Sequence, residues 1–481
     1  MSTTNLESVK HKTAPQDIVP LIQKIAFGSG HLANQLFPAA LGVFMYYLVV
    51  AFKMDPFDAG LLAALPRVLD ALTDPIMGYI SDNTTSKWGR RKPYIFLGAV
   101  FTGVSYMGMW QLYPENGIDF NYYFFLIMSF VFYIGYTIFA TPLIGLGYEM
   151  TPDYNERTRL MASSQTMGQM AWMIAPWFWF MIPNWFETPE IGVRSMSIWV
   201  GILCIILGIM PALFCKEIDQ SNLTGRKKLS FKDLSESMMG LFKGIVETVK
   251  NKPFRKLCGA TFLVFNGFQT IAQFALFIIV YYLFNGSYED AGTWPAWFGT
   301  ISAASTAFLV IPIITWMSTK MGKKNAFIVS TLISVVGYAL KWWGFNTANL
   351  WLMFLPIPLM TFGIGGLFTL MMSMTADVCD LDELTNGMPR KEGTFGAVYW
   401  WMVKLGTAVA LATSGAVLSW IGFDQNVTVQ SAETLLQLRI ADIVIPVATG
   451  LLAILVMWNY DLDENRAREI REILVERRGE L

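Results

Sequence analysis

The stretch "RVLDALTDPIMGYISDNTTSKWGRRKP", residues 67–93, joins an apolar run to a basic loop. Asp70 and Asp74 lie four residues apart in the apolar run, so a helix would present them on one face, and Arg67 precedes Asp70 by three. A carboxylate at the centre of a membrane helix costs about 2.5–3.5 kcal/mol on insertion scales. Charges placed at that cost favour a functional site in the membrane.

The composition is that of an integral membrane protein. Of 481 residues, 54% are hydrophobic and only 15% are charged, whereas soluble domains carry about a quarter charged residues. A net charge of −1 without a basic stripe argues against a nucleic-acid surface. The two histidines and four dispersed cysteines provide no metal-ligand or redox spacing. We therefore expect that the protein is not an enzyme and binds no cofactor.

Windows of roughly 20 mostly apolar residues predict about twelve transmembrane helices. The runs are long and continuous, which favours helices over a barrel of alternating strands. The predicted spans are 25–51, 57–81, 93–112, 122–146, 158–182, 195–215, 257–285, 296–317, 326–344, 350–374, 396–420 and 438–459.

The longest polar break, 216–256, separates six spans from six. Within it, residues 230–253 place apolar side chains near one helical face, which predicts an amphipathic helix on the membrane surface. The predicted organisation is a cytoplasmic N-terminal tail 1–20, a six-helix bundle 21–215, a cytoplasmic middle loop 216–256, a second six-helix bundle 257–459 and a cytoplasmic helix or tail 460–481.

The two halves repeat a short motif. "SKWGRRKPYIF", 86–96, aligns without gaps with "TKMGKKNAFIV", 319–329, and each follows the second helix of its half. A six-plus-six repeat is typical of the major facilitator fold. The chain is thus predicted to be an all-α membrane protein of that fold, in two six-helix halves. The basic loops place both termini in the cytoplasm by the positive-inside rule.

Asp70 and Asp74, with the hydroxyl of Thr73, suit a small hard cation that prefers oxygen ligands. They suit a proton equally, since one of two paired buried carboxylates holds its proton more tightly. Lys404 lies inside the eleventh span, where it could pair with the acids or hold an anionic substrate. The alternatives are a structural salt bridge with Arg67 and a Lys404 that reaches toward the membrane surface.

Uncharged polar side chains at helical spacing predict a polar cavity for a hydroxyl-rich ligand. Trp400 and Trp401 lie one turn before Lys404 and offer flat faces to a sugar ring. His31 could donate to a substrate, carry a proton or pack as a neutral ring. Alternatively, each amide bridges two helices. The stripes comprise Asn34 and Gln35 in the first span, Gln165, Gln169 and Trp172 in the fifth, and Asn266, Gln269 and Gln273 in the seventh.

Four blocks resemble the glycoside-pentoside-hexuronide:cation symporter family, and the resemblance as a whole covers both halves, essentially residues 24–460. They are "FGSGHLANQL", "DALTDPIMGYISDNTTSKWGRRKPY", "GYEMTPDYNERTRL" and "MTADVCDLDELTNGMPRKEGTFGAVYWWMVKLG". The resemblance implies that Asp70, Thr73 and Asp74 are cation-site residues. It implies that Lys404 is the functional lysine of the eleventh helix.

The same resemblance places Arg67 on the cavity face, and Tyr399 and Trp400 where the family has polar residues near the cation or sugar. The melibiose permease branch holds its sugar with two aspartates and an arginine. This chain has Gln35, Ala140 and Gln165 at those positions. The two glutamines can bond hydroxyl groups, whereas Ala140 cannot; Thr137 and Thr141 could supply oxygen instead.

We therefore expect a Na⁺- or H⁺-coupled symporter that imports a glycoside, oligosaccharide or uronide by alternating access. The alternative is a sodium-coupled lysolipid carrier. The protein is expected to be a monomer in a bacterial inner membrane, with Asp82, Arg90 and Arg91 latching its cytoplasmic face. The predicted substrate-binding residues are His31, Asn34, Gln35, Arg67, Gln165, Gln169, Trp172, Asn266, Gln273, Tyr399, Trp400 and Trp401.

Overall fold

The computed structural model describes residues 17–217 and 250–478, except for 85, 152–153, 387–391 and 463, together with residues 239, 246 and 248. The predicted tail before residue 17, the amphipathic helix of the middle loop and the side chain of Asp82 lie outside this description. The described part of the chain contains helices and no strand, so the predicted all-α class is confirmed.

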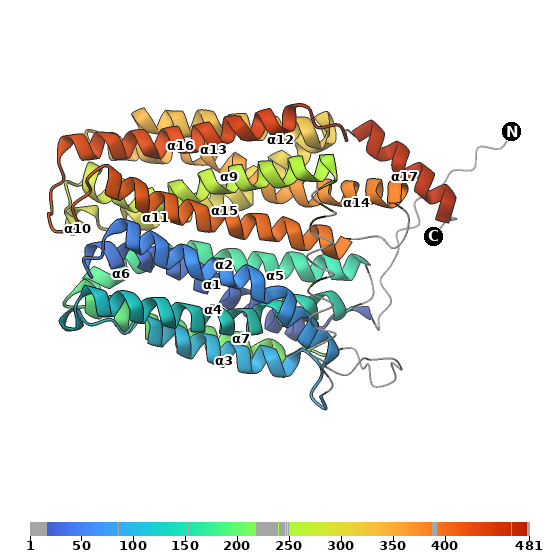
Figure 1. The fold of residues 1–481 in the computed structure, drawn as a ribbon, viewed down its shortest axis with the longest axis horizontal. Helices are drawn as coiled ribbons and strands as arrows, with labels where there is room; N and C mark the ends of the chain where they lie inside the picture. The colour runs from blue at the N-terminus through green and yellow to red at the C-terminus, as the bar shows by residue number, and fades with distance from the viewer. Residues whose placement is uncertain are drawn as a thin grey trace.

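The first half is a bundle in which one span is broken. Pro176 lies in a 3-10 turn, η3 (Ala175–Trp177), which divides the predicted span 158–182 into α5 and α6 because proline removes a backbone donor. The helices are α1 (Leu21–Val50), α2 (Pro56–Asn83), α3 (Lys92–Met109), the short η2 (Pro114–Asn116), α4 (Ile118–Glu149), α5 (Tyr154–Ile174), α6 (Phe178–Trp185) and α7 (Pro189–Phe214). Figure 1 shows most of them lying nearly parallel.

The second half packs beside the first (Figure 1). Three of its spans contain single turns of π-helix, η4 (Ile278–Leu283), η5 (Ser305–Val310) and η7 (Leu367–Met371). The α-helices are α9 (Lys252–Phe277), α10 (Tyr288–Ala291), α11 (Trp294–Ala304), α12 (Ile311–Gly344), α13 (Ile357–Gly366), α14 (Met372–Asn386), α15 (Glu392–Trp420), α16 (Ala432–Trp458) and α17 (Glu464–Arg478), with a 3-10 turn η6 (Leu350–Phe354).

The sequence repeat has a counterpart in the backbone. Gly322 interrupts α12 with φ 78°, and Gly89, its partner in the aligned motif, has φ 104°. Both values lie in the left-handed region that glycine adopts at no steric cost. A cation of each motif then reaches an acid on a later helix: Arg91 contacts Glu149 at 2.9 Å, and Lys323 contacts Asp377 at 2.6 Å.

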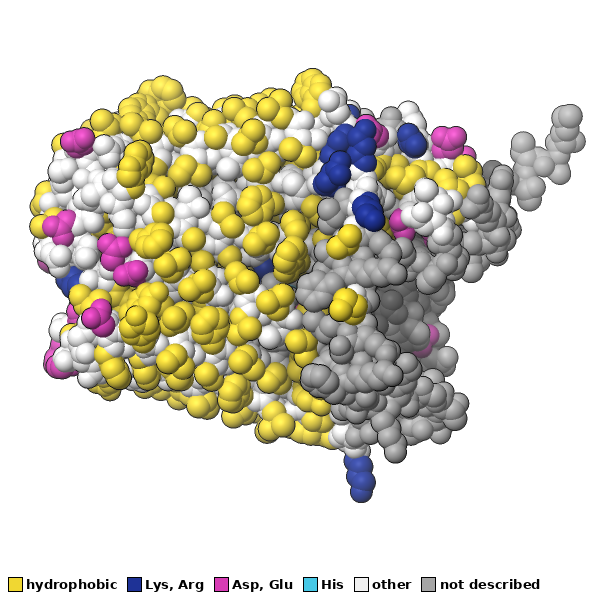
Figure 2. All heavy atoms as spheres, in the orientation of Figure 1, with side chains coloured by type: hydrophobic (Ala, Val, Ile, Leu, Met, Phe, Trp, Pro, Cys, Tyr) yellow, Lys and Arg dark blue, Asp and Glu magenta, His cyan; other side chains and the backbone are white. Residues whose placement is uncertain are grey.

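Apolar side chains cover the middle of the surface (Figure 2). By length and composition, eight described helical segments could cross a membrane, and one of them, Tyr288–Gly344, contains the break at Gly322 and so comprises two spans. Lysines and arginines gather at the end where α17 lies, while the opposite end shows mainly acids (Figure 2). This asymmetry fits the positive-inside prediction, and the assignment of that end to the cytoplasm stays a prediction.

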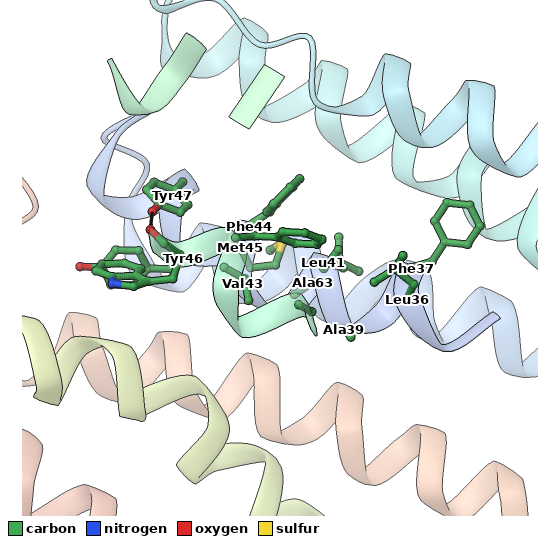
Figure 3. Packing of buried hydrophobic residues seen from close by; sticks show 14 of the residues in the cluster. Leu36, Phe37, Ala39, Leu41, Val43, Phe44, Met45, Tyr46, Tyr47 and Ala63 are labelled. Atoms are coloured by element: carbon green, nitrogen blue, oxygen red, sulfur yellow. Dashed lines mark hydrogen bonds between the residues drawn. The ribbon is translucent and has the colours of Figure 1, made fainter. Parts of the chain in front are cut away.

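The largest apolar cluster is built around α1. Phe37, Phe44 and Tyr47 are fully buried, and Figure 3 shows neighbouring side chains of α1 packed along the same helix. The cluster continues into the second half through residues such as Phe277. Apolar packing therefore joins the two halves as well as filling the first.

The two halves pack closely where α2 crosses α15. A side-chain carbon at Gly415 would lie 2.3 Å from the backbone oxygen of Pro56 and 3.0 Å from the Cα of Gly60. Only glycine allows two backbones to approach so closely. This crossing brings the acid-bearing face of α2 against the helix that carries Lys404.

Candidate functional site

The centre of the site is a cluster of three charged side chains between α2 and α15. Lys404 Nζ lies 2.8 Å from Asp70 Oδ2 and 2.5 Å from Asp74 Oδ2. Asp70 is fully buried, whereas the side chain of Asp74 is 37% exposed. The two acids and the lysine that the sequence singled out therefore meet, and Lys404 does not reach away from them toward the membrane surface.

Hydroxyl groups of α4 complete the cluster. Thr137 Oγ1 donates to Asp70 Oδ1, and Thr141 Oγ1 donates to Asp74 Oδ1, both at 3.1 Å. Thr73 Oγ1 lies 2.9 Å from Thr137 Oγ1. The two threonines of α4 that could supply oxygen to a sugar thus contact the acids, and a sugar contact stays a prediction. Four carboxylate and three hydroxyl oxygens share one cluster, a donor set that fits a small hard cation.

Arg67 turns toward α4 and contacts neither acid in the described structure. Its guanidinium lies over the ring of Tyr133, 5.1 Å from the ring centroid. This is a cation–π geometry, in which the face of the aromatic ring attracts the guanidinium while the guanidinium keeps its positive charge. One stretch of α2 thus carries Arg67, Asp70 and Asp74, and α15 of the other half adds the second cation, Lys404.

Polar side chains link α1 to α5 beside this cluster. His31 Nε2 lies 3.2 Å from Gln165 Oε1, and Trp172 Nε1 donates to Gln35 Oε1 at 3.1 Å. Gln165 and Trp172 are exposed. The predicted stripe of the fifth span therefore faces the predicted residues of the first, and it leaves accessible polar atoms there.

The remaining predicted substrate residues are scattered. Asn266 Nδ2 contacts the backbone oxygen of Gly406 at 3.5 Å, a bridge from α9 to α15. Tyr399 is fully buried in the apolar cluster of the second half, away from the α1–α5 group. Trp400 is 46% exposed beside Phe368. Of the others, Asn34 is buried, Gln273 lines a cavity between the halves, and Gln169 and Trp401 are partly buried.

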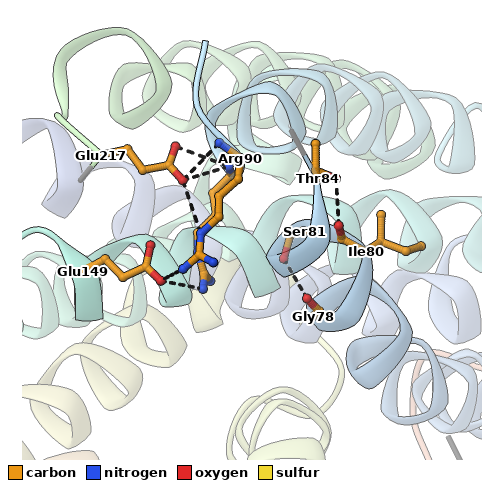
Figure 4. A network of polar contacts seen from close by, with 8 residues as sticks. Gly78, Ile80, Ser81, Thr84, Arg90, Glu149 and Glu217 are labelled. Carbon is orange, nitrogen blue, oxygen red and sulfur yellow. Dashed lines mark hydrogen bonds and ion pairs between the residues drawn. The ribbon is translucent and has the colours of Figure 1, made fainter. Parts of the chain in front are cut away.

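The predicted latch residues form an ion-pair network within the first half (Figure 4). Arg90 and Arg91 both contact Glu149 Oε1 at the end of α4. Their backbone N–H groups donate to Glu217, which follows α7, at 3.1 and 3.2 Å. The network therefore ties the α2–α3 loop to two helix ends at the basic face of the bundle.

Contacts at the opposite end join the two halves, and the sequence analysis missed them. Lys53 Nζ donates to the backbone oxygen of Gln425 at 2.6 Å, and Ser419 Oγ donates to Asp55 Oδ1 at 2.9 Å. The hydroxyl groups of Tyr46 and Tyr288 lie 3.1 Å apart. A lysine that binds a backbone carbonyl leaves no charge pattern to find, although "KMD" before a proline does mark a turn.

The family described as "MFS/sugar transport protein" matches residues 26–464. The Escherichia coli (strain K12) "Glucuronide carrier protein homolog" is 26% identical and covers 93% of both chains. The Lactiplantibacillus pentosus "Isoprimeverose transporter" is 22% identical, covering 98% of this chain and 94% of its own. The mouse "Sodium-dependent lysophosphatidylcholine symporter 1" is also 22% identical, covering 97% and 90%.

Solved structures show the same fold at low identity. A D-xylose-proton symporter superposes with a TM-score of 0.60 at 15% identity, covering 92% of this chain and 96% of its own. A nucleoside transporter superposes with a TM-score of 0.62 at 14% identity, covering 91% and 100%. These likenesses confirm the predicted major facilitator fold.

Proposed function

Because this chain belongs to the MFS/sugar transport protein family, we propose that it is a symporter that couples sugar uptake to a cation gradient. The family and its relatives make it a multi-pass membrane transporter rather than an enzyme. The observation that supports cation coupling is Lys404, whose ammonium group lies between the carboxylates of Asp70 and Asp74.

The ammonium group occupies the place that a bound cation would take. Two carboxylates at short range stabilise one positive charge, and Lys404 supplies it in the structure. An arriving Na⁺ or H⁺ would displace the lysine, free it for the substrate and separate α15 from α2. Binding energy of the cation would thereby favour the state that binds sugar, and sugar must then raise cation affinity by the same factor.

The sugar is proposed to bind along α1 and α5. Gln35, Gln165 and Trp172 offer uncharged donors and acceptors, which suit hydroxyl groups. The named relatives include carriers of a glucuronide and of isoprimeverose. A glycoside, oligosaccharide or uronide is therefore the proposed substrate class, with Lys404 available to a carboxylate once the cation has bound.

Alternating access explains why cross-half polar contacts occur at the end of Lys53 and Tyr46. The contacts Lys53–Gln425 and Tyr46–Tyr288 hold the halves together there. The ion-pair network of Arg90 and Arg91 stays within one half among the described contacts. We propose that the basic end is cytoplasmic, in a monomer in a bacterial inner membrane.

The experiment is uptake into proteoliposomes under an imposed Na⁺ or H⁺ gradient. Methyl β-D-glucuronide and isoprimeverose serve as probes, with a lysophosphatidylcholine tested beside them because of the lysolipid relatives. Sugar accumulation driven by one gradient and abolished in Asp74→Ala supports the proposal. Accumulation by Asp74→Ala equal to wild type would contradict cation coupling. Uptake of lysolipid alone would favour the sodium-coupled lysolipid carrier instead.

A further inference from the structure

A small cavity between the two halves lies next to the glycine crossing of α2 and α15, and the predicted substrate residue Gln273 lines it. It lies among α1, α2, α9 and α15, and Ala63 and Leu411 line it. Ala63 precedes Asp70 by seven residues on α2, and Leu411 follows Lys404 by seven on α15. Seven residues are about two helical turns, or ~10 Å. The cavity therefore lies two turns from the ion cluster, on the side of the closed contacts.

The polar groups of this cavity include a hydroxyl without a partner. Ser414 is 3% exposed, and its Oγ has no hydrogen-bond partner among the described residues. Thr407, two turns earlier on the same helix, donates to the backbone oxygen of Val403 in the usual way. A buried hydroxyl that forgoes its bond is unfavourable. Gln273 adds an amide to the lining, and none of the described lining residues is charged.

The space depends on a glycine that packing does not require. A side-chain carbon at Gly42, which lines the cavity, would meet no atom within 4 Å. Gly415, in contrast, is held between backbone atoms of α2. An alanine at position 42 would also form a better helix than glycine. The absent side chain leaves room rather than allowing contact between helices.

Resting on the proposed function, we infer that this cavity is a subsite for an uncharged hydroxyl or hydroxymethyl group of the sugar. Ser414 Oγ and the Gln273 amide would bind that group. The volume of about 40 Å³ admits a hydroxymethyl group or a few water molecules, not a sugar ring. The lack of charge disfavours the cation and a carboxylate. The subsite thus fixes the end of the sugar that points away from Lys404.

The test compares two cavity variants with a matched control. Gly42→Ala fills the space, and Ser414→Ala removes the hydroxyl. Gly259→Ala introduces the same methyl group into α9, where it would contact Val456 at 3.7 Å. Gradient-driven uptake gives KM for methyl β-D-glucuronide and isoprimeverose. Stabilisation by Na⁺ or by lower pH, measured without sugar as a shift in Tm, reports the ion cluster.

Ser414→Ala is expected to raise KM roughly fivefold, the loss of one neutral hydrogen bond. Gly42→Ala is expected to raise KM because its methyl group takes the space of the bound group, and the ion-dependent shift in Tm should stay unchanged in both variants. A deoxy analogue that lacks the bound hydroxyl should be insensitive to Ser414→Ala, which a double-mutant comparison detects. KM values within twofold of Gly259→Ala would overturn the subsite and leave the proposed function standing. Failure of the wild type to accumulate any sugar would overturn both.

Discussion

Lys404 bridges two carboxylates of the opposite half, with Nζ 2.8 Å from Asp70 Oδ2 and 2.5 Å from Asp74 Oδ2. One ammonium group therefore satisfies two acids that would otherwise repel each other across one turn of α2. The same group is a competitor for any cation that uses these acids. Stability and ion affinity are thus opposed at a single side chain.

Lys404→Ala should lower stability without a cation and strengthen cation binding. Removing one partner of a buried pair costs about 3–5 kcal/mol, and the partial exposure of Lys404 and Asp74 reduces this figure. Tm of the purified protein should fall in choline chloride and recover in NaCl, more than in wild type. An equal Tm in choline chloride and NaCl would contradict competition between Lys404 and the cation. Lys404→Arg, which keeps the positive charge, is the control.

Asp70→Asn and Asp74→Asn should abolish accumulation while keeping exchange of sugar across the membrane. Each amide preserves the shape of the acid and its bond from Thr137 or Thr141 but removes the charge that holds a cation. Counterflow of labelled sugar, which needs no gradient, separates coupling from substrate binding. Loss of counterflow in both variants would show that the acids hold the sugar rather than the ion.

Lys53→Ala should weaken the closed end of the bundle. Lys53 has φ 58°, a strained value for a residue with a side chain, and it donates across the halves to Gln425. Removing about 1 kcal/mol of closing energy should increase opening roughly fivefold. A cysteine at Gly42, the four native cysteines being buried, reports opening through its reaction with an impermeant thiol reagent.

The control for this prediction is Asn285→Gly. Asn285 also has positive φ, at 49°, but its turn lies within the second half. Its substitution should leave the labelling rate unchanged. Equal labelling of Lys53→Ala and wild type would mean that the lysine does not hold the halves together.

Gly145→Ala should reproduce the effect of Arg91→Ala without removing any charged residue from the protein. A side-chain carbon at position 145 would overlap Arg91 Nη1, so the guanidinium must shift from its present contact with Glu149. Stability should fall by about 1–3 kcal/mol, as for other overpacked sites, and the uptake rate should fall in parallel. Gly259→Ala is the matched control, and normal uptake by Gly145→Ala would separate the ion-pair network from transport.

Asp442→Asn should destabilise the second half strongly. Asp442 on α16 forms an ion pair with Lys341 on α12, and both side chains are fully buried. The lone ammonium should reduce stability by about 3–5 kcal/mol. The double variant Lys341→Met with Asp442→Leu should restore most of the Tm and transport. Restored Tm without transport would assign this pair a role in the cycle.

Much of the fold could be predicted because it follows from local rules. The membrane spans can be predicted from apolar runs long enough to cross a bilayer, and the repeat from the aligned glycines of two loops. Neither prediction needs to know how the helices pack. The meeting of Asp70, Asp74 and Lys404 was also predictable, since unpaired charges inside apolar helices must find one another. Pro176 is visible in the sequence, but the length of the apolar run alone does not show that the fifth span is broken there.

The rest depended on contacts that leave no periodic pattern. Thr137 and Thr141 resemble many membrane threonines until α4 is packed against α2. Lys53 binds a backbone carbonyl, which every residue has. Tyr399 and Trp400 are neighbours in sequence, yet one is buried in the second half and the other is half exposed. The rotation of each helix about its axis determines which neighbours these side chains meet, and a single sequence does not specify that rotation.

The glycine crossing of α2 and α15 has a mechanical consequence. No side chain separates Gly60 from Gly415, so the two helices touch directly at one point near an end of each. This contact can act as a fulcrum about which α2 and α15 tilt. From Gly60 to Asn83, α2 extends ~35 Å at the usual rise. A tilt of roughly 10° at the fulcrum would displace the far end by ~6 Å over a helix of that length. A small tilt at the crossing would therefore move the two halves apart most at the basic face, which is the end of α2 farthest from Gly60.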